Sequence, residues 1–70
     1  MTTYKINPAH SGTSESEIRK AKRLFLANVK KGKISYSNNI GLVFSDINNQ
    51  IKVDFIDLND MELLGTENII

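Results

Sequence analysis

The sequence predicts an α+β domain in which one amphipathic helix packs on one face of a three- or four-stranded antiparallel meander. Apolar residues recur at helical spacing over residues 15–31, and after Gly32 they recur at every second position. A length of 70 residues leaves room for one hydrophobic core. Residues 1–70 are therefore expected to form a single small domain.

The first element is expected at residues 3–7, where TYKIN favours a short strand at an edge of the sheet. Tyr4 and Ile6 would then share one face. Pro8 ends this strand, because proline has no backbone N–H to donate and disfavours helix in the residue before it. The stretch PAHSGTS that follows indicates a loop.

The helix is expected at residues 15–31. Ser14 and Glu17 have the S-x-x-E spacing of a capping box, and Gly32 stands where a left-handed residue commonly ends a helix. At about 100° per residue, the apolar and basic side chains separate into opposite arcs. The apolar arc contains Ile18, Ala21, Leu24, Phe25 and Val29. The basic arc contains Arg19, Lys20, Arg23, Lys30 and Lys31.

Three strands are expected after the helix, at residues 33–37, 40–45 and 51–57. Asn38 and Asn39 suit a two-residue turn, because asparagine tolerates positive φ. Residues 46–50 would form a longer second loop. The C-terminal tail, residues 59–70, is compatible with either a helical turn or a short strand.

These two connections fix the register of the predicted sheet. Val43 would pair with Val53, and Gly41 with Phe55, on the face that the helix covers. The opposite face would then carry four large apolar side chains. They are Ile40, Leu42, Phe44 and Ile56. Since a face that meets only water should not hold such residues in adjacent positions, it predicts a second contact surface. A slip of one residue in either turn would exchange the faces.

The chain is therefore expected to be a small non-enzymatic protein-binding or regulatory module that acts through this second face. A homodimer or a larger protein partner is expected, because domains below about 70–80 residues rarely gain more than ~3–5 kcal/mol from one core. An inhibitor or regulator encoded by a phage or mobile element would fit the small size and the Asn-, Ile- and Lys-rich composition.

Nucleic-acid binding through the basic arc is the alternative. Seven of the nine basic residues lie within residues 14–33, and such an arc can neutralise phosphates. The same residues also suit the solvent face of a helix, and Lys30 and Lys31 lie where the helix dipole favours cations. The net charge is only +1, but residues 1–34 carry +6 and residues 35–70 carry −5, so the halves should attract one another.

Catalytic and metal chemistry are not expected. The chain has no cysteine and one histidine, His10, which has no evident orienting partner. Asp54, Asp57, Asp60 and Glu62 lack the EF-hand pattern and suit a solvated edge or, alternatively, a mimic of nucleic acid. No catalytic residue, cofactor, metal or small-molecule substrate is therefore predicted.

A cytoplasmic location without a membrane partner is expected. No segment approaches the roughly 20 apolar residues that span a bilayer. The N-terminal stretch MTTYKINPAHSG has no apolar core of the kind found in secretory signals.

Overall fold

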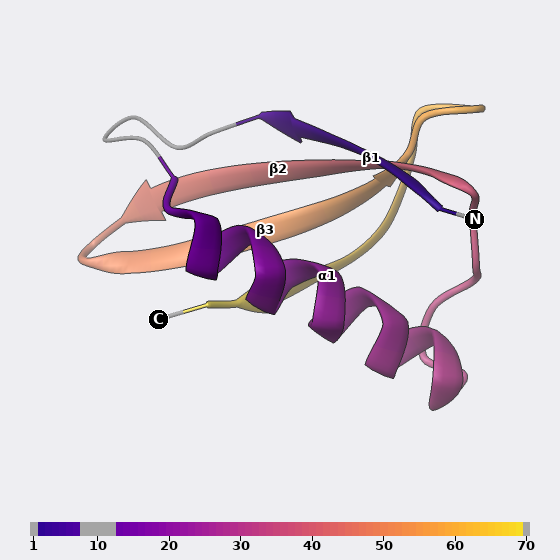
Figure 1. Cartoon of the computed structure of the whole chain (residues 1–70), viewed down its shortest axis with the longest axis horizontal. Helices are drawn as coiled ribbons and strands as arrows, with labels where there is room; N and C mark the ends of the chain where they lie inside the picture. The colour runs from indigo at the N-terminus through magenta and orange to yellow at the C-terminus, as the bar shows by residue number, and fades with distance from the viewer. Residues whose placement is uncertain (1, 8–12, 70) are drawn as a thin grey trace.

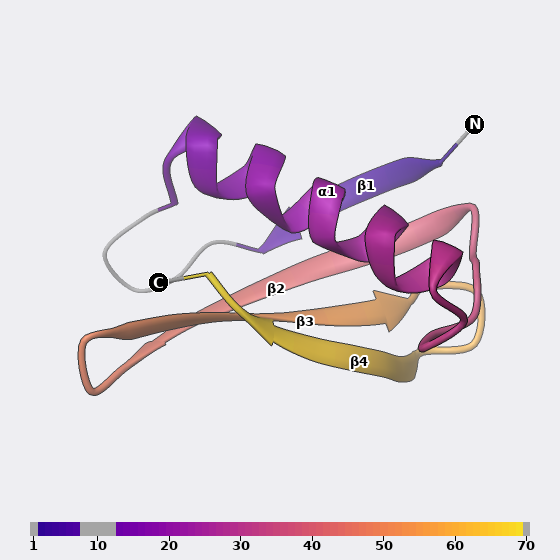
Figure 2. The same ribbon diagram turned by 90° about the horizontal axis from the view of Figure 1, so that it is seen from below.

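One helix packs against one face of a four-stranded sheet in the computed structural model, which describes residues 2–7 and 13–69 (Figure 1). This arrangement confirms the predicted α+β fold class. The elements are β1 (Thr3–Asn7), α1 (Glu15–Lys30), β2 (Asn39–Ile47), β3 (Gln50–Asp57) and β4 (Glu62–Asn68). Figure 2 looks onto the helix-covered face, with the four strands side by side and α1 in front of them. In Figure 1, α1 lies on one side of the sheet, and no other described helix or strand covers the opposite side.

The strand order is β1-β2-β3-β4, and the sheet is mixed rather than purely antiparallel. β2, β3 and β4 form an antiparallel meander, whereas β1 runs parallel to β2. The parallel pair follows from the connection, because α1 lies between the two strands and returns the chain to the end at which β1 began. β1 is an edge strand, as predicted. The undecided C-terminal tail supplies β4.

The helix begins and ends where the local sequence signals place it. Ser14 Oγ accepts a hydrogen bond from the backbone N–H of Glu17 at 3.2 Å, and Glu17 Oε1 accepts one from the N–H of Ser14 at 2.8 Å. At the other end, Gly32 has a φ of +77°, and the N–H of Lys33 donates to the carbonyl of Asn28 at 2.9 Å. These bonds form a capping box and a Schellman motif, which satisfy backbone groups that the helix itself leaves unpaired.

The strand predicted at residues 33–37 is absent. This stretch is an irregular connection between α1 and β2. Its alternating apolar residues pack in other ways, since Ile34 lies against the core and Tyr36 is half exposed, with its hydroxyl 2.8 Å from Thr2 Oγ1. The alternation thus reflects a connection that follows the surface of the core, not a paired strand.

The register of β2 against β3 differs by one residue from the prediction. The turn is formed by Asn48 and Asn49, with φ values of 54° and 63°, and not by a five-residue loop. Two consecutive positive φ values are the requirement of a type I′ hairpin turn. Leu42 consequently pairs with Phe55, and Phe44 with Val53.

This shift reverses the faces of β2. Ile40, Leu42 and Phe44 point toward α1, with exposed fractions of 0%, 0% and 4%. Their predicted place on an exposed second face is wrong, and Val43 lies on that face instead. The core that they complete is centred on Phe25, whose ring centroid is 5.6 Å from that of Phe55.

Candidate protein-binding face

The sheet face opposite α1, here called the outer face, is partly apolar. Pairing across all four strands places Lys5, Gly41, Ile56 and Leu63 in one row. The next row along the strands contains Asn7, Val43, Asp54 and Thr66. The outer face therefore combines apolar side chains near its centre with a cation on its β1 edge.

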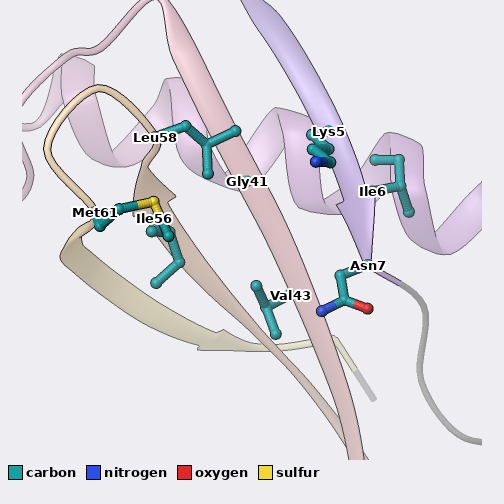
Figure 3. Close-up of a pocket in the computed structure, with 8 residues that line it drawn as sticks. All are labelled: Lys5, Ile6, Asn7, Gly41, Val43, Ile56, Leu58 and Met61. Atoms are coloured by element: carbon teal, nitrogen blue, oxygen red, sulfur yellow. The ribbon is translucent and has the colours of Figure 1, made fainter.

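A pocket of about 310 Å³ lies on this face (Figure 3). Its volume is at the lower end of the range of roughly 300–1,000 Å³ that is typical of ligand pockets. The lining comes from β1, β2, β3 and the β3–β4 loop, and consists of Lys5, Ile6, Asn7, Gly41, Val43, Ile56, Leu58 and Met61. Lys5 is the only charged residue among them, so the pocket is an apolar recess with one cation at its edge.

Gly41 allows the β3–β4 loop to lie against the sheet. A Cβ atom at this position would be 3.0 Å from Leu58 Cδ2, because the Leu58 side chain lies across β2 at Gly41 (Figure 3). The backbone of Leu58 is also attached to β2, since its N–H donates to the carbonyl of Asn39 at 2.9 Å. A larger residue at position 41 would displace this wall of the pocket.

Acidic side chains shape the same loop. Asp57 Oδ1 accepts hydrogen bonds from Ser37 Oγ at 2.9 Å and from the N–H of Asn59 at 3.0 Å. Asp60 Oδ1 accepts one from the N–H of Glu62 at 3.2 Å. These bonds are typical of turns stabilised by aspartate. Two of the carboxylates predicted to form a solvated edge, Asp57 and Asp60, therefore stabilise the loop.

Met61, in the β3–β4 loop, combines a left-handed backbone conformation with a largely exposed apolar side chain. Its φ is +60°, a left-handed conformation that is rare for a bulky side chain and costs about 1–2 kcal/mol. The side chain points toward Ile56 over the outer face (Figure 3), yet 71% of the residue is exposed. Leu63, the next outward residue of β4, is 57% exposed. Two large apolar side chains, Met61 in the pocket wall and Leu63 next to it on β4, are thus largely exposed to solvent.

Of the four residues predicted to bind a protein, only Ile56 lies on the outer face, where it lines the pocket. Sequence reasoning missed Val43, Leu58, Met61 and Leu63. The signal that could have placed Val43 there is the second Asn-Asn pair at positions 48 and 49, which favours a tight hairpin as much as the first pair does.

The basic arc lies on the solvent side of α1. Arg19, Arg23, Lys30 and Lys31 are exposed and form no ion pair within residues 2–7 and 13–69. The arc's fifth member, Lys20, donates from Nζ to the carbonyl of Ile69 at 2.7 Å. Lys20 therefore attaches Ile69 to the helix, while the other four cations have no ion-pair partner among the described residues.

Within residues 2–7 and 13–69, the expected attraction between the basic and acidic halves does not take the form of ion pairs with this arc. Two of the acidic side chains, Asp54 and Glu67, have neutral partners. Asp54 accepts from Thr66 Oγ1 at 2.7 Å, and Glu67 accepts from Asn28 Nδ2 at 2.6 Å.

Within the described residues, no group of three or more histidines or carboxylates could hold a metal ion. No helix in that part of the chain is long and apolar enough to cross a membrane. A scan against protein-family models found no match, and searches of curated proteins and of solved structures found none either.

Proposed function

We propose that the chain is a small non-enzymatic protein-binding or regulatory module whose contact surface is the outer face of its sheet. The pocket carries this proposal, because its apolar walls continue into the exposed side chains of Met61 and Leu63. Contiguous exposed apolar surface of this kind is typical of interaction sites in soluble proteins. Methionine and aromatic residues are also enriched in protein interfaces, where a flexible thioether adapts to its partner.

The position of the pocket supports contact with a protein. It is open along the sheet surface and is bordered by strands and by a short loop, so a partner could approach it with a surface of its own. Asn7 and Lys5 supply polar groups at the β1 side, as interface rims commonly do. A regulatory role and a cytoplasmic location are part of the proposal, and both rest on the sequence alone.

Site-specific photo-crosslinking tests the proposal. A photoreactive benzoylphenylalanine in place of Leu63 is expected to form adducts when the chain is irradiated in the cells that produce it. The matched control carries the same group in place of Leu26, which is 51% exposed but lies on the helix. Adducts at Leu63 and not at Leu26 support the outer face, whether the partner is another copy or a different protein. Equal labelling at the two positions, or none at Leu63, contradicts it.

Nucleic-acid binding by α1 is a second candidate function. One observation favours it, namely that Arg19, Arg23, Lys30 and Lys31 are exposed and unpaired within the described chain. Cations without carboxylate partners can neutralise phosphates without first breaking an ion pair. Binding of this kind would depend on backbone charge, because the arc offers no amide side chain for base edges.

Fluorescence anisotropy with labelled duplex and single-stranded oligonucleotides tests this candidate. Binding should be measurable at low salt and should weaken steeply as salt is added. Substituting both Arg23→Glu and Lys30→Glu should abolish it, whereas Lys52→Glu, on the opposite side of the sheet, should reduce it much less. If the wild-type chain binds neither oligonucleotide at low salt, nucleic-acid binding is wrong.

A further inference from the structure

We propose that α1 and the connection after it bind a single-stranded nucleic acid. One base stacks on the ring of Tyr36, and the cations of the helix hold neighbouring phosphates. The inference rests on the second candidate function, nucleic-acid binding by α1, and names the class of nucleic acid. It follows from an exposed aromatic ring that lies beside a basic surface.

Tyr36 presents a fixed aromatic ring to solvent. It lies in the irregular connection between α1 and β2, and 52% of the residue is exposed. One side of the ring is next to the fully buried Phe25, with the ring centroids 6.5 Å apart and the planes inclined by 38°. The hydroxyl group lies 2.8 Å from Thr2 Oγ1. Because the ring is already held in place, it loses little conformational entropy when a planar group stacks on its open side.

A helix cation belongs to the same group of contacts. Lys22 Nζ is 5.0 Å from the centroid of the Tyr4 ring, which is a cation–π contact. The Tyr4 ring meets Phe25 edge-on, with centroids 6.2 Å apart, and Phe25 in turn lies next to Tyr36. Figures 1 and 2 both show the start of β1, the end of α1 and the connection after it at one end of the molecule. The exposed ring and the helix cations are therefore parts of one surface.

This surface is basic because its stretch of sequence has no carboxylates. Residues 18–45 contain seven lysine and arginine residues and no aspartate or glutamate. Lys30, at the end of α1, and Lys33, three residues before Tyr36, are both exposed. A region of this composition attracts anions.

Acidic residues lie at the same end of the sheet, but toward its β4 edge. They come from β3, β4 and the loop between these strands, and are Asp57, Asp60 and Glu62. Asp57 accepts a hydrogen bond at 2.9 Å from Ser37, which is buried. Tyr36 instead contacts Thr2, the residue before β1, at the edge of the sheet opposite β4. The exposed ring is therefore on the basic side of this end of the molecule.

A ring beside cations distinguishes between kinds of polyanion. A polyphosphate would satisfy the cations and leave the ring unused. The bases of a duplex are stacked on one another, so their faces are closed to Tyr36. A single strand offers both phosphates and unstacked bases, and proteins that bind single strands combine aromatic side chains with basic surfaces. Little sequence preference is expected, because every base has a face that can stack.

Tyrosine fluorescence tests the stacking directly, because the chain has two tyrosines and no tryptophan. In the Tyr4→Phe variant, Tyr36 is the only tyrosine, and a base stacked on its ring should quench most of its emission. The probe is an oligothymidylate of about 12 nucleotides. Tyr36→Phe is the matched control, since it keeps a ring for stacking but leaves Tyr4, which Lys22 covers, as the only emitter. Quenching should be much weaker in the control.

Binding affinities separate stacking from general attraction. Tyr36→Ala should weaken binding of the oligothymidylate by about fivefold to a hundredfold, which corresponds to the loss of one stacked base. The same variant should bind a duplex of equal length and inorganic polyphosphate as the wild type does, because neither offers a free base. Fluorescence anisotropy at low salt measures the labelled oligonucleotides, and competition measures the polyphosphate. Circular dichroism verifies that each variant is folded.

Two results overturn the single-strand site. One is a Tyr36→Ala variant that loses affinity for all three ligands alike, or for none of them. The other is Tyr36 emission that stays unchanged while the oligothymidylate binds. The candidate function fails separately, when the wild-type chain binds neither single strand nor duplex at low salt. Binding of all three ligands without a contribution from Tyr36 would leave a basic helix that attracts any polyanion.

Discussion

Asn28 Nδ2 lies 2.6 Å from Glu67 Oε2 and donates a hydrogen bond that joins the buried side of α1 to the edge strand β4. Asn28 is buried on the helix, and Glu67 lies opposite Val53 on the helix-covered face of the sheet. The helical pattern alone does not explain a buried asparagine at this position. The hydrogen bond to Glu67 explains it, because a half-buried carboxylate needs a hydrogen-bond donor.

Asn28→Ala is expected to lower the free energy of unfolding by about 1–3 kcal/mol, since it leaves the Glu67 carboxylate half-buried without its partner. Urea denaturation followed by circular dichroism measures the change. The double variant Asn28→Ala, Glu67→Gln should recover part of the loss, because it also removes the charge. A single variant as stable as the wild type would show that solvent replaces the bond.

Leu42 and Leu63 separate the two faces of the sheet experimentally. Leu42→Ala should destabilise the chain by about 2–5 kcal/mol, because Leu42 is fully buried under α1. Leu63→Ala should change the stability of the monomer by no more than about 0.5 kcal/mol, because Leu63 is 57% exposed on the outer face. Dilute samples keep any association from contributing. The reverse order of the two effects would contradict the register of β2.

The sequence predicts the helix well because its signals are local. Ser14, Glu17 and Gly32 act within one turn of the helix ends, and the apolar arc needs no knowledge of the sheet. The α+β class follows from the change of period after Gly32.

The register could not be predicted in the same way. Asn38-Asn39 and Asn48-Asn49 are identical pairs, and each suits a hairpin turn. The pairing of β1 with β2 decides between them, because the N–H of Thr3 donates to the carbonyl of Asn38 at 2.8 Å. That bond joins residues far apart in the chain, so no local pattern reveals it. The outer face, which depends on the register, was therefore assigned to the wrong residues of β2.

Asn49→Gly is expected to stabilise the chain by about 0.5–1 kcal/mol. Asn49 has a φ of 63°, and glycine adopts this conformation without the steric cost that a side chain carries. For a domain of this size, the melting temperature should rise by roughly 4–8 °C per kcal/mol. Asn49→Ala is the comparison variant and should lower it. A melting temperature that falls for both would indicate that the asparagine side chain has a further role in the turn.

Alkaline pH is expected to weaken the fold through Tyr4. Burial, and then the neighbouring Tyr36, raises the pKa of the Tyr4 phenol above its usual value of 10.0. The folded chain therefore holds this proton more tightly than the unfolded chain does. The contribution to stability is fully present below about pH 10 and is lost as the pH rises through the raised pKa. Chemical denaturation of the wild type and of Tyr4→Phe, compared between pH 8 and about 11, isolates this contribution. An identical pH dependence in both chains would contradict it.

Gly41 and Leu58 provide a test of the pocket wall. Gly41→Ala should destabilise the chain by about 1–3 kcal/mol, because the new methyl group would be 3.0 Å from Leu58 Cδ2 and would force that side chain to move. Leu58→Ala should cost less in the Gly41→Ala background than in the wild type, because it removes the atom that the methyl group meets. A thermodynamic cycle of the four chains measures this coupling, which should exceed about 0.5 kcal/mol. If the two effects are simply additive, the Leu58 side chain does not lie against Gly41 in solution.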